Sequence, residues 1–282
     1  MRRNVRRTTA ALTVGLVVFL GSCTSLDGSL EPALSIVHHG ILECFAPGYS
    51  AANGKPVSCE TSAVERIGSR VLLISDKETP DAQATQGLWF DAKRFRSESI
   101  PHSLVRYDRR RALLDARKIE GLAASQDGRW IFATSAFDRP SDPGSAESDA
   151  YDSLLYWSVR RPQDVKVAQA TADRGVVSSI ALRGRFASAL ADASSAAGPP
   201  YFKIEGLTTL PGDRLLFGVR EMGLDYDHFD YVVALVETRY TIEAGELQLD
   251  EKFRNAVRLR LSVPEDPAVE EMRPVQPIGV GA

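Results

Sequence analysis

The 282-residue sequence has no excess of charge of either sign. Its 34 Lys and Arg residues stand against 37 Asp and Glu residues, which leaves a net charge of -3 and an isoelectric point near 5.9. A nucleic-acid-binding domain is expected to carry a basic balance or a basic stripe. The composition therefore argues against nucleic acid as a partner, while 44% hydrophobic residues are ordinary for a globular domain.

The sequence also lacks the most distinctive catalytic motifs. It contains no Gly-x-Ser-x-Gly elbow, no His-Glu-x-x-His pair and no glycine-rich phosphate loop. Only four histidines occur, and His102 and His228 are isolated. The sequence therefore identifies no catalytic residue and leaves open whether the protein is an enzyme.

The apolar run near the N-terminus, residues 10–20, has about half of the roughly 20 apolar residues that a membrane-spanning helix needs. Four arginines precede it, and Leu20-Gly21-Ser22-Cys23 follows it. This arrangement resembles the lipobox of bacterial lipoproteins, in which the cysteine becomes the lipidated first residue. The resemblance implies a signal peptide over residues 1–22 and a membrane anchor on Cys23; an ordinary signal peptide with an incidental cysteine is the alternative.

The address that follows from this segment is the bacterial cell envelope, with the protein lipid-anchored and facing the periplasm. Thr24 rather than aspartate follows the cysteine, which by analogy with Gram-negative sorting permits transfer to the outer membrane.

Two cysteines remain, Cys44 and Cys59. The envelope is oxidising and no further soft ligand stands near them, so a disulfide is favoured over a metal pair. Such a bond would stabilise the fold by about 3 kcal/mol in the chain-entropy model. Two buried free thiols are the alternative.

Composition divides the rest of the chain into three parts. Residues 23–60 form a tether and an irregular lead-in, residues 61–263 carry the strand patterns, and residues 264–282 form a tail rich in proline and glutamate. One short helix is expected near residues 185–193.

An internal repeat is the strongest signal in the strand-rich part. Residues 118–122 read Lys-Ile-Glu-Gly-Leu, and residues 203–207 repeat the phrase; seven of the fifteen positions from 118 to 132 are identical at an offset of 85. Each copy predicts a strand, a turn and a second strand that ends in Phe132 or Phe217. Half of a propeller blade has this pattern.

The repeat therefore predicts an all-β, propeller-like fold. A blade takes about 40 to 45 residues, so residues 61–263 have room for four or five blades, in a ring that is small, incomplete or open.

The Glu-Gly-Leu phrases, with Asp127-Gly128 after the first and Arg214 to Arg220 after the second, resemble bacterial propellers of the "esterase-like activity of phytase" group. They resemble a related bacterial family of unassigned function more closely. The resemblance covers about residues 64–240. It implies a propeller fold and says little about activity.

In a propeller, the inner strands bring equivalent residues to the mouth of the central channel. The repeat therefore nominates a set of ligand-binding candidates at this mouth: Glu120, Glu205, Asp76, Lys77, Asp138, Arg139, Arg220 and Glu221. Glu120 and Glu205 are the candidate metal ligands, for Ca²⁺, because carboxylate oxygens suit that ion. Alternatively, both glutamates have a structural role that repeats with each blade.

Two functional hypotheses follow from these observations. The first is a lipid-anchored envelope propeller that binds a ligand or a protein partner without catalysis. The second is a metal-dependent phosphoesterase or esterase-like hydrolase, in which a metal-activated water attacks the ester.

Overall fold

A computed structural model of the chain describes residues 41–50, 54–55, 57, 59–75, 87–96, 99–108, 110–138, 146–173, 176–192 and 196–260. The chain divides into two units, Met1–Val37 and His38–Ala282, and all the described residues belong to the second. The predicted signal peptide, the anchor at Cys23 and the tail over residues 264–282 lie outside the described residues.

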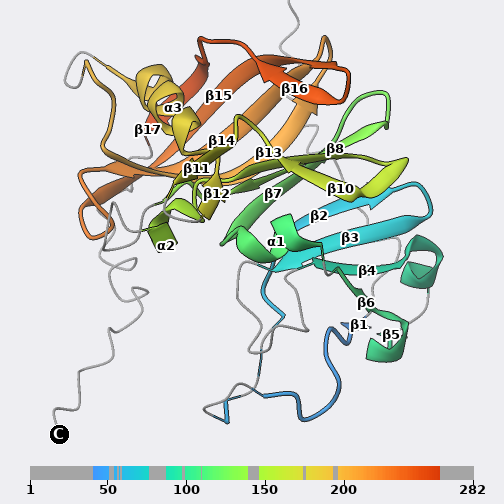
Figure 1. Ribbon diagram of the computed structural model, residues 1–282. Coiled ribbons are helices and arrows are strands. Elements are labelled where there is room, and N and C mark those ends of the chain that lie inside the picture. The colour runs from blue at the N-terminus through green and yellow to red at the C-terminus, as the bar shows by residue number, and fades with distance from the viewer. Residues whose placement is uncertain are drawn as a thin grey trace, which may run out of the picture. The chain divides into compact units, whose positions relative to one another are not determined.

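Most of the secondary structure is β, in three antiparallel sheets of four or five strands and two small sheets (Figure 1). The first sheet contains β2 (Thr61–Ile67), β3 (Arg70–Ser75), β4 (Gly87–Asp91) and β6 (Arg106–Tyr107). The second contains β7 (Ile119–Ala124), β8 (Trp130–Ser135), β9 (Leu154–Ser158) and β10 (Arg161–Val167). The third contains β13 (Tyr201–Leu210), β14 (Arg214–Gly223), β15 (Phe229–Glu243), β16 (Glu246–Leu249) and β17 (Arg254–Arg260).

The smaller elements connect and cover these sheets. β1 (Ile41–Leu42) pairs with β5 (Ser99–Ile100), and β11 (Thr171–Asp173) pairs with β12 (Val176–Ser178). The helices are α1 (Arg111–Asp115), α2 (Ala146–Asp149), α3 (Arg183–Leu190) and three short 3-10 helices, Ala92–Arg96, His102–Leu104 and Ile180–Leu182.

The prediction of an all-β protein is therefore confirmed, and the number of blades stays a prediction. Within the described residues no sheet closes on itself. The helix expected near residues 185–193 is α3, but it is not the only helix among the described residues. α3 ends at Leu190, and α1 and α2 are two further short helices that carry no extended apolar face in the sequence.

The first strands of the three sheets lie side by side, with β7 in contact with both β2 and β13. Hydrogen bonds join them: the Ser62 hydroxyl donates to the Ile119 carbonyl at 2.6 Å, and the Thr209 hydroxyl donates to the Ala124 carbonyl at 2.7 Å. These strands approach too closely for a side chain at one point. A Cβ on Gly121 would lie 2.7 Å from the Leu207 Cβ and 2.8 Å from its backbone nitrogen.

The two copies of the repeat are equivalent up to the turn. The pairing register shifts between Ile119 and Gly121 in β7, and between Ile204 and Gly206 in β13. Each shift marks a β-bulge at the glutamate of the phrase. The repeated glutamates therefore occupy the same irregularity in two neighbouring sheets.

After the turn, the two copies differ by one residue in the register with which the second strand pairs with the first. In the second sheet Ala123 pairs with Phe132, whereas in the third sheet the equivalent Thr208 pairs with Leu216 and not with Phe217. A one-residue slip turns side chains to the other face of a strand. Phe132 and Phe217 consequently face each other across the same core, although the sequence alignment makes them equivalent.

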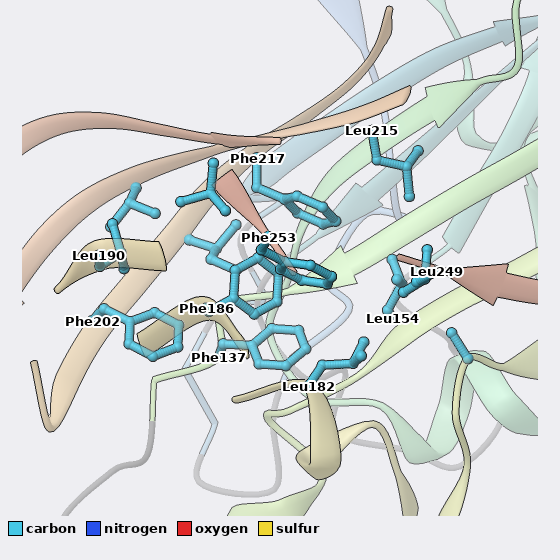
Figure 2. Close-up of a cluster of buried hydrophobic side chains, with 14 of the residues drawn as sticks. Phe137, Leu154, Leu182, Phe186, Leu190, Phe202, Leu215, Phe217, Leu249 and Phe253 are labelled. Carbon is cyan, nitrogen blue, oxygen red and sulfur yellow. The ribbon is translucent and has the colours of Figure 1, made fainter. Parts of the chain in front are cut away.

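That core lies between the second and third sheets and is rich in phenylalanine (Figure 2). Phe186 of α3 is its centre, with ring centroids 4.9 Å from both Phe217 and Phe253 and 5.1 Å from Phe137. A second cluster, which includes Leu72, Ile119 and Trp157, fills the space between the first and second sheets. Each large sheet thus buries one face against the next.

The remaining face of the first sheet is covered by the lead-in segment. Cys44 and Cys59, the two cysteines that the sequence pairs, are joined by a disulfide with a Cα–Cα distance of 6.0 Å. Cys44 belongs to a buried cluster with Leu88 and Phe90, and the Tyr107 hydroxyl donates to its carbonyl at 3.1 Å.

The repeat glycines provide a matched stability test. We expect Gly121→Ala to destabilise the protein by about 1–3 kcal/mol, because the new methyl group overlaps Leu207 and its backbone. Gly206→Ala, at the equivalent position, has nothing within 4 Å of the added Cβ and should be neutral or slightly stabilising. Urea unfolding followed by circular dichroism measures both, and equal effects of the two substitutions would contradict this packing.

Candidate functional site

Five of the eight sequence-predicted site residues are described, and they lie at one end of the second and third sheets. Glu120 and Glu205 occupy the bulges of β7 and β13, and Arg220 and Glu221 are on β14. Asp138 follows β8 after two residues. The other three candidates, Asp76, Lys77 and Arg139, lie outside the described residues.

In the second sheet, Asp138 is held by the lysine that begins the repeat. The Lys118 ammonium lies 2.5 Å from the Asp138 carboxylate, which is only 1% exposed. Burial opposes the charged form of Lys118, but Asp138 outweighs that effect and raises the pKa of the lysine. Lys118 therefore stays charged throughout the physiological pH range.

In the third sheet, the equivalent lysine bonds the glutamate of its own phrase. Lys203 contacts the Glu205 carboxylate, and Arg220 approaches the same oxygen at 3.1 Å. Arg220 also donates to Glu221, at 3.0 Å from its Nε, while Lys203 lies 3.9 Å from that carboxylate. Two cations and two carboxylates thus form one neutral network.

A buried tyrosine completes the hydrogen bonding of Glu221. The Tyr201 hydroxyl donates to the Glu221 Oε2 at 2.7 Å. Burial by itself opposes ionisation of Glu221, but the bonds from Tyr201 and Arg220 outweigh it and lower the pKa of Glu221. Burial and the adjacent carboxylate hold the pKa of Tyr201 far above its ordinary value, so this phenol acts as a donor and not as a base.

Tyr226 connects the two halves of the site. Its ring centroid lies 5.9 Å from the Lys118 ammonium and 6.2 Å from the ring of Tyr201. The charged residues of the two ion-pair networks described above form what we call the rim cluster: Lys118, Asp138, Lys203, Glu205, Arg220 and Glu221. The cluster contains side chains from both copies of the repeat.

The rim cluster does not have the donor set of a Ca²⁺ site. Such a site offers about six to eight oxygen ligands to the ion. Here the Glu205 and Glu221 carboxylates already bind Lys203 and Arg220. Within the described residues, no three His, Cys, Asp or Glu side chains are grouped closely enough to hold a metal ion.

Sequence reasoning missed four members of this site. Tyr201 and Tyr226 belong to no motif, and only the fold brings them beside Glu221 and Lys118. Lys118 and Lys203 did carry a signal, because the repeated phrase begins with lysine in both copies. An ion pair between that lysine and a carboxylate at the end of the same sheet is the role that the two copies share.

The acidic segment around Asp225 forms the turn between β14 and β15. The Asp225 carboxylate accepts hydrogen bonds from the backbone nitrogens of Asp227 and His228, both at 2.9 Å. The side chain therefore closes the loop between β14 and β15.

Comparisons with known proteins give no family for the chain: no family model matches it, and neither curated proteins nor solved structures provide a match. Among the described residues, no helix combines the length and hydropathy needed to cross a membrane.

The Glu221 network predicts a pH-dependent stability difference. Glu221→Gln should lower the free energy of unfolding by about 1–3 kcal/mol at pH 7, less than a fully buried pair because Arg220 is partly exposed. The folded-state pKa of Glu221 lies below its ordinary value of 4.5, so ionised Glu221 contributes stability above that value and loses it as pH falls through the folded pKa.

The difference between wild type and variant should therefore shrink below pH 4.5 in urea titrations. Glu246→Gln is the control, since Glu246 pairs with Lys166 at an exposed position and its loss should change stability less. A Glu221→Gln effect that is constant from pH 7 to pH 3 would refute this role.

Proposed function

We propose that the protein is a lipid-anchored binding protein of the bacterial cell envelope, propeller-like in fold, which recognises a protein partner without catalysis. The supporting observation is an apolar part of the outward face of the third sheet, which is exposed among the described residues. Tyr231, Val233 and Val257 are 58%, 39% and 41% exposed. Val257 pairs with Leu235, which places the two side chains on the same face.

Among the described residues, none of the three buried clusters covers this part of the third sheet. The phenylalanine core covers the opposite side of the third sheet, and the lead-in covers the first sheet. Leu216 and Leu235 belong to none of the three buried clusters of the described residues. Contiguous exposed apolar surface of this kind marks protein interfaces.

The residues beside this face suit a protein partner. The guanidinium of Arg220 lies 6.0 Å from the Tyr231 ring, and the Tyr226 side chain is half exposed. Tyrosine and arginine are the residues enriched at interface hot spots, because each combines apolar area with a hydrogen-bonding group. The rim cluster beneath them is neutral and internally bonded, so it can hold these side chains in place without a ligand of its own.

The hydrolase hypothesis makes a different demand on the same residues. It requires the carboxylates of the rim cluster to release their cations and bind a metal that activates water. The propeller-like fold is part of both proposals, and the face-to-face packing of successive sheets of four or five strands supports it. The phytase-like resemblance belongs to the hydrolase hypothesis alone.

A photo-crosslinking experiment tests the binding proposal. The full-length protein is produced in its own envelope with a benzophenone amino acid at Tyr231 or Val233, and at the exposed Lys93 of the 3-10 helix Ala92–Arg96 as the control. We expect an adduct with another polypeptide from the first two positions and none from Lys93. Equal labelling at all three positions, or none at any, would remove the proposed interface.

Calcium titration separates the two hypotheses. Binding raises the melting temperature in proportion to ln(1 + [L]/Kd). We expect no shift with Ca²⁺ and no turnover of p-nitrophenyl phosphate. A shift and a turnover that both disappear in Glu205→Gln would favour the hydrolase instead.

A further inference from the structure

A second charged site lies at the opposite end of the third sheet from the rim cluster. Here a notch of about 140 Å³ is lined by four cationic side chains and two carboxylates: Arg214, Arg239, Lys252, Arg254, Glu237 and Asp250. Arg214 begins β14, six residues before Arg220, so the two sites are separated by about 20 Å along the strand. We call this second site the basic notch.

The basic notch contains an unfavourable cross-strand pair. Arg214 and Arg239 are directly opposite each other in the antiparallel ladder of β14 and β15. Like charges in this position destabilise a sheet. The charge of Arg214 is compensated by Glu237, whose carboxylate accepts a hydrogen bond from the Arg214 Nη1 at 2.9 Å. Glu237 is also the residue directly opposite Arg254 in the pairing of β15 with β17. The Glu237 carboxylate is therefore shared among several guanidinium groups, and Asp250 is the other carboxylate that lines the notch.

The remaining cations have no partner within the described part of the chain. The side chains of Arg239, Lys252 and Arg254 make no ion pair or hydrogen bond there, whereas every described cation of the rim cluster is paired. The loop that carries Lys252 is fixed by backbone contacts, because the Asp250 nitrogen donates to the Arg239 carbonyl at 3.1 Å and Arg185 donates to the Asp250 carbonyl at 3.0 Å. The unpaired charges are thus held around one small space.

We propose that the basic notch binds a tetrahedral oxyanion, a phosphate group that is either free or esterified. Guanidinium groups present paired N–H donors that match two oxygens of such a group, and Lys252 adds a point charge. The volume equals that of only a few water molecules, at about 30 Å³ each in the liquid, so it suits one such group and not a large ligand. A bound dianion would remove the repulsion between Arg214 and Arg239. This site is independent of the interface proposed above.

The test uses the full-length protein in detergent with inorganic phosphate, at constant ionic strength maintained with chloride. We expect calorimetric binding of phosphate and a higher melting temperature in phosphate than in chloride. Arg239→Gln and Arg254→Gln should each raise the Kd about tenfold or more, as expected for the loss of a charge-assisted hydrogen bond. Arg160→Gln, an exposed arginine outside the notch, should leave the Kd unchanged.

A second measurement separates binding from misfolding. In chloride alone, Arg239→Gln should be at least as stable as wild type, because it relieves the like-charge pair, while it loses the stabilisation by phosphate. Dihexanoyl-phosphatidylglycerol below its micellar concentration identifies the source: competition with phosphate assigns a lipid headgroup, and its failure assigns a free oxyanion. The proposal is overturned if phosphate gives no shift over chloride, or if the shift persists in both notch variants.

Discussion

The contact between β7 and β13 is the constraint on which the rest of the structure depends. Gly121 leaves the space that Leu207 occupies, so the two strands approach closely enough for Thr209 to bond the Ala124 carbonyl. The same approach brings Phe132 and Phe217 into one buried cluster. It also places the ends of both strands together, and with them Lys118 beside Tyr226. A side chain at position 121 would separate the sheets and thereby the site.

The sheets are covered unequally, and this inequality determines which surface is available for function. The first sheet is covered by a lead-in that a disulfide closes, and the second sheet is covered on both faces by its neighbours. The third sheet presents Tyr231, Val233 and Val257 outward. A partner that covers such a face removes apolar surface from water, which contributes roughly 25 cal/mol of binding free energy for each Å² covered. The exposed face is therefore where recognition is expected.

The two charged regions of the third sheet differ in how their charges are balanced. In the rim cluster, lysine and arginine alternate with carboxylates, and Tyr201 supplies the last hydrogen bond to Glu221. Such a network holds side chains rigidly and has little remaining affinity for ions. In the basic notch, Arg239, Lys252 and Arg254 have no carboxylate of their own among the described residues. Unbalanced charge, and not charge itself, is what identifies an ion-binding site.

The sequence by itself determined the strand-rich class, the pairing of Cys44 with Cys59 and the equivalence of the two Lys-Ile-Glu-Gly-Leu phrases, because local patterns and short spacings carry that information. It also nominated Glu205, Arg220 and Glu221, within a larger set, as candidates for one site. Only the tertiary structure decided which face each second strand presents, since the pairing of β8 with β7 and the pairing of β14 with β13 differ by one residue, and a slip of one residue inverts a strand. It alone placed Tyr201 and Tyr226 beside the rim cluster and set Arg214 opposite Arg239, because those contacts depend on strand register and sheet packing rather than on any motif.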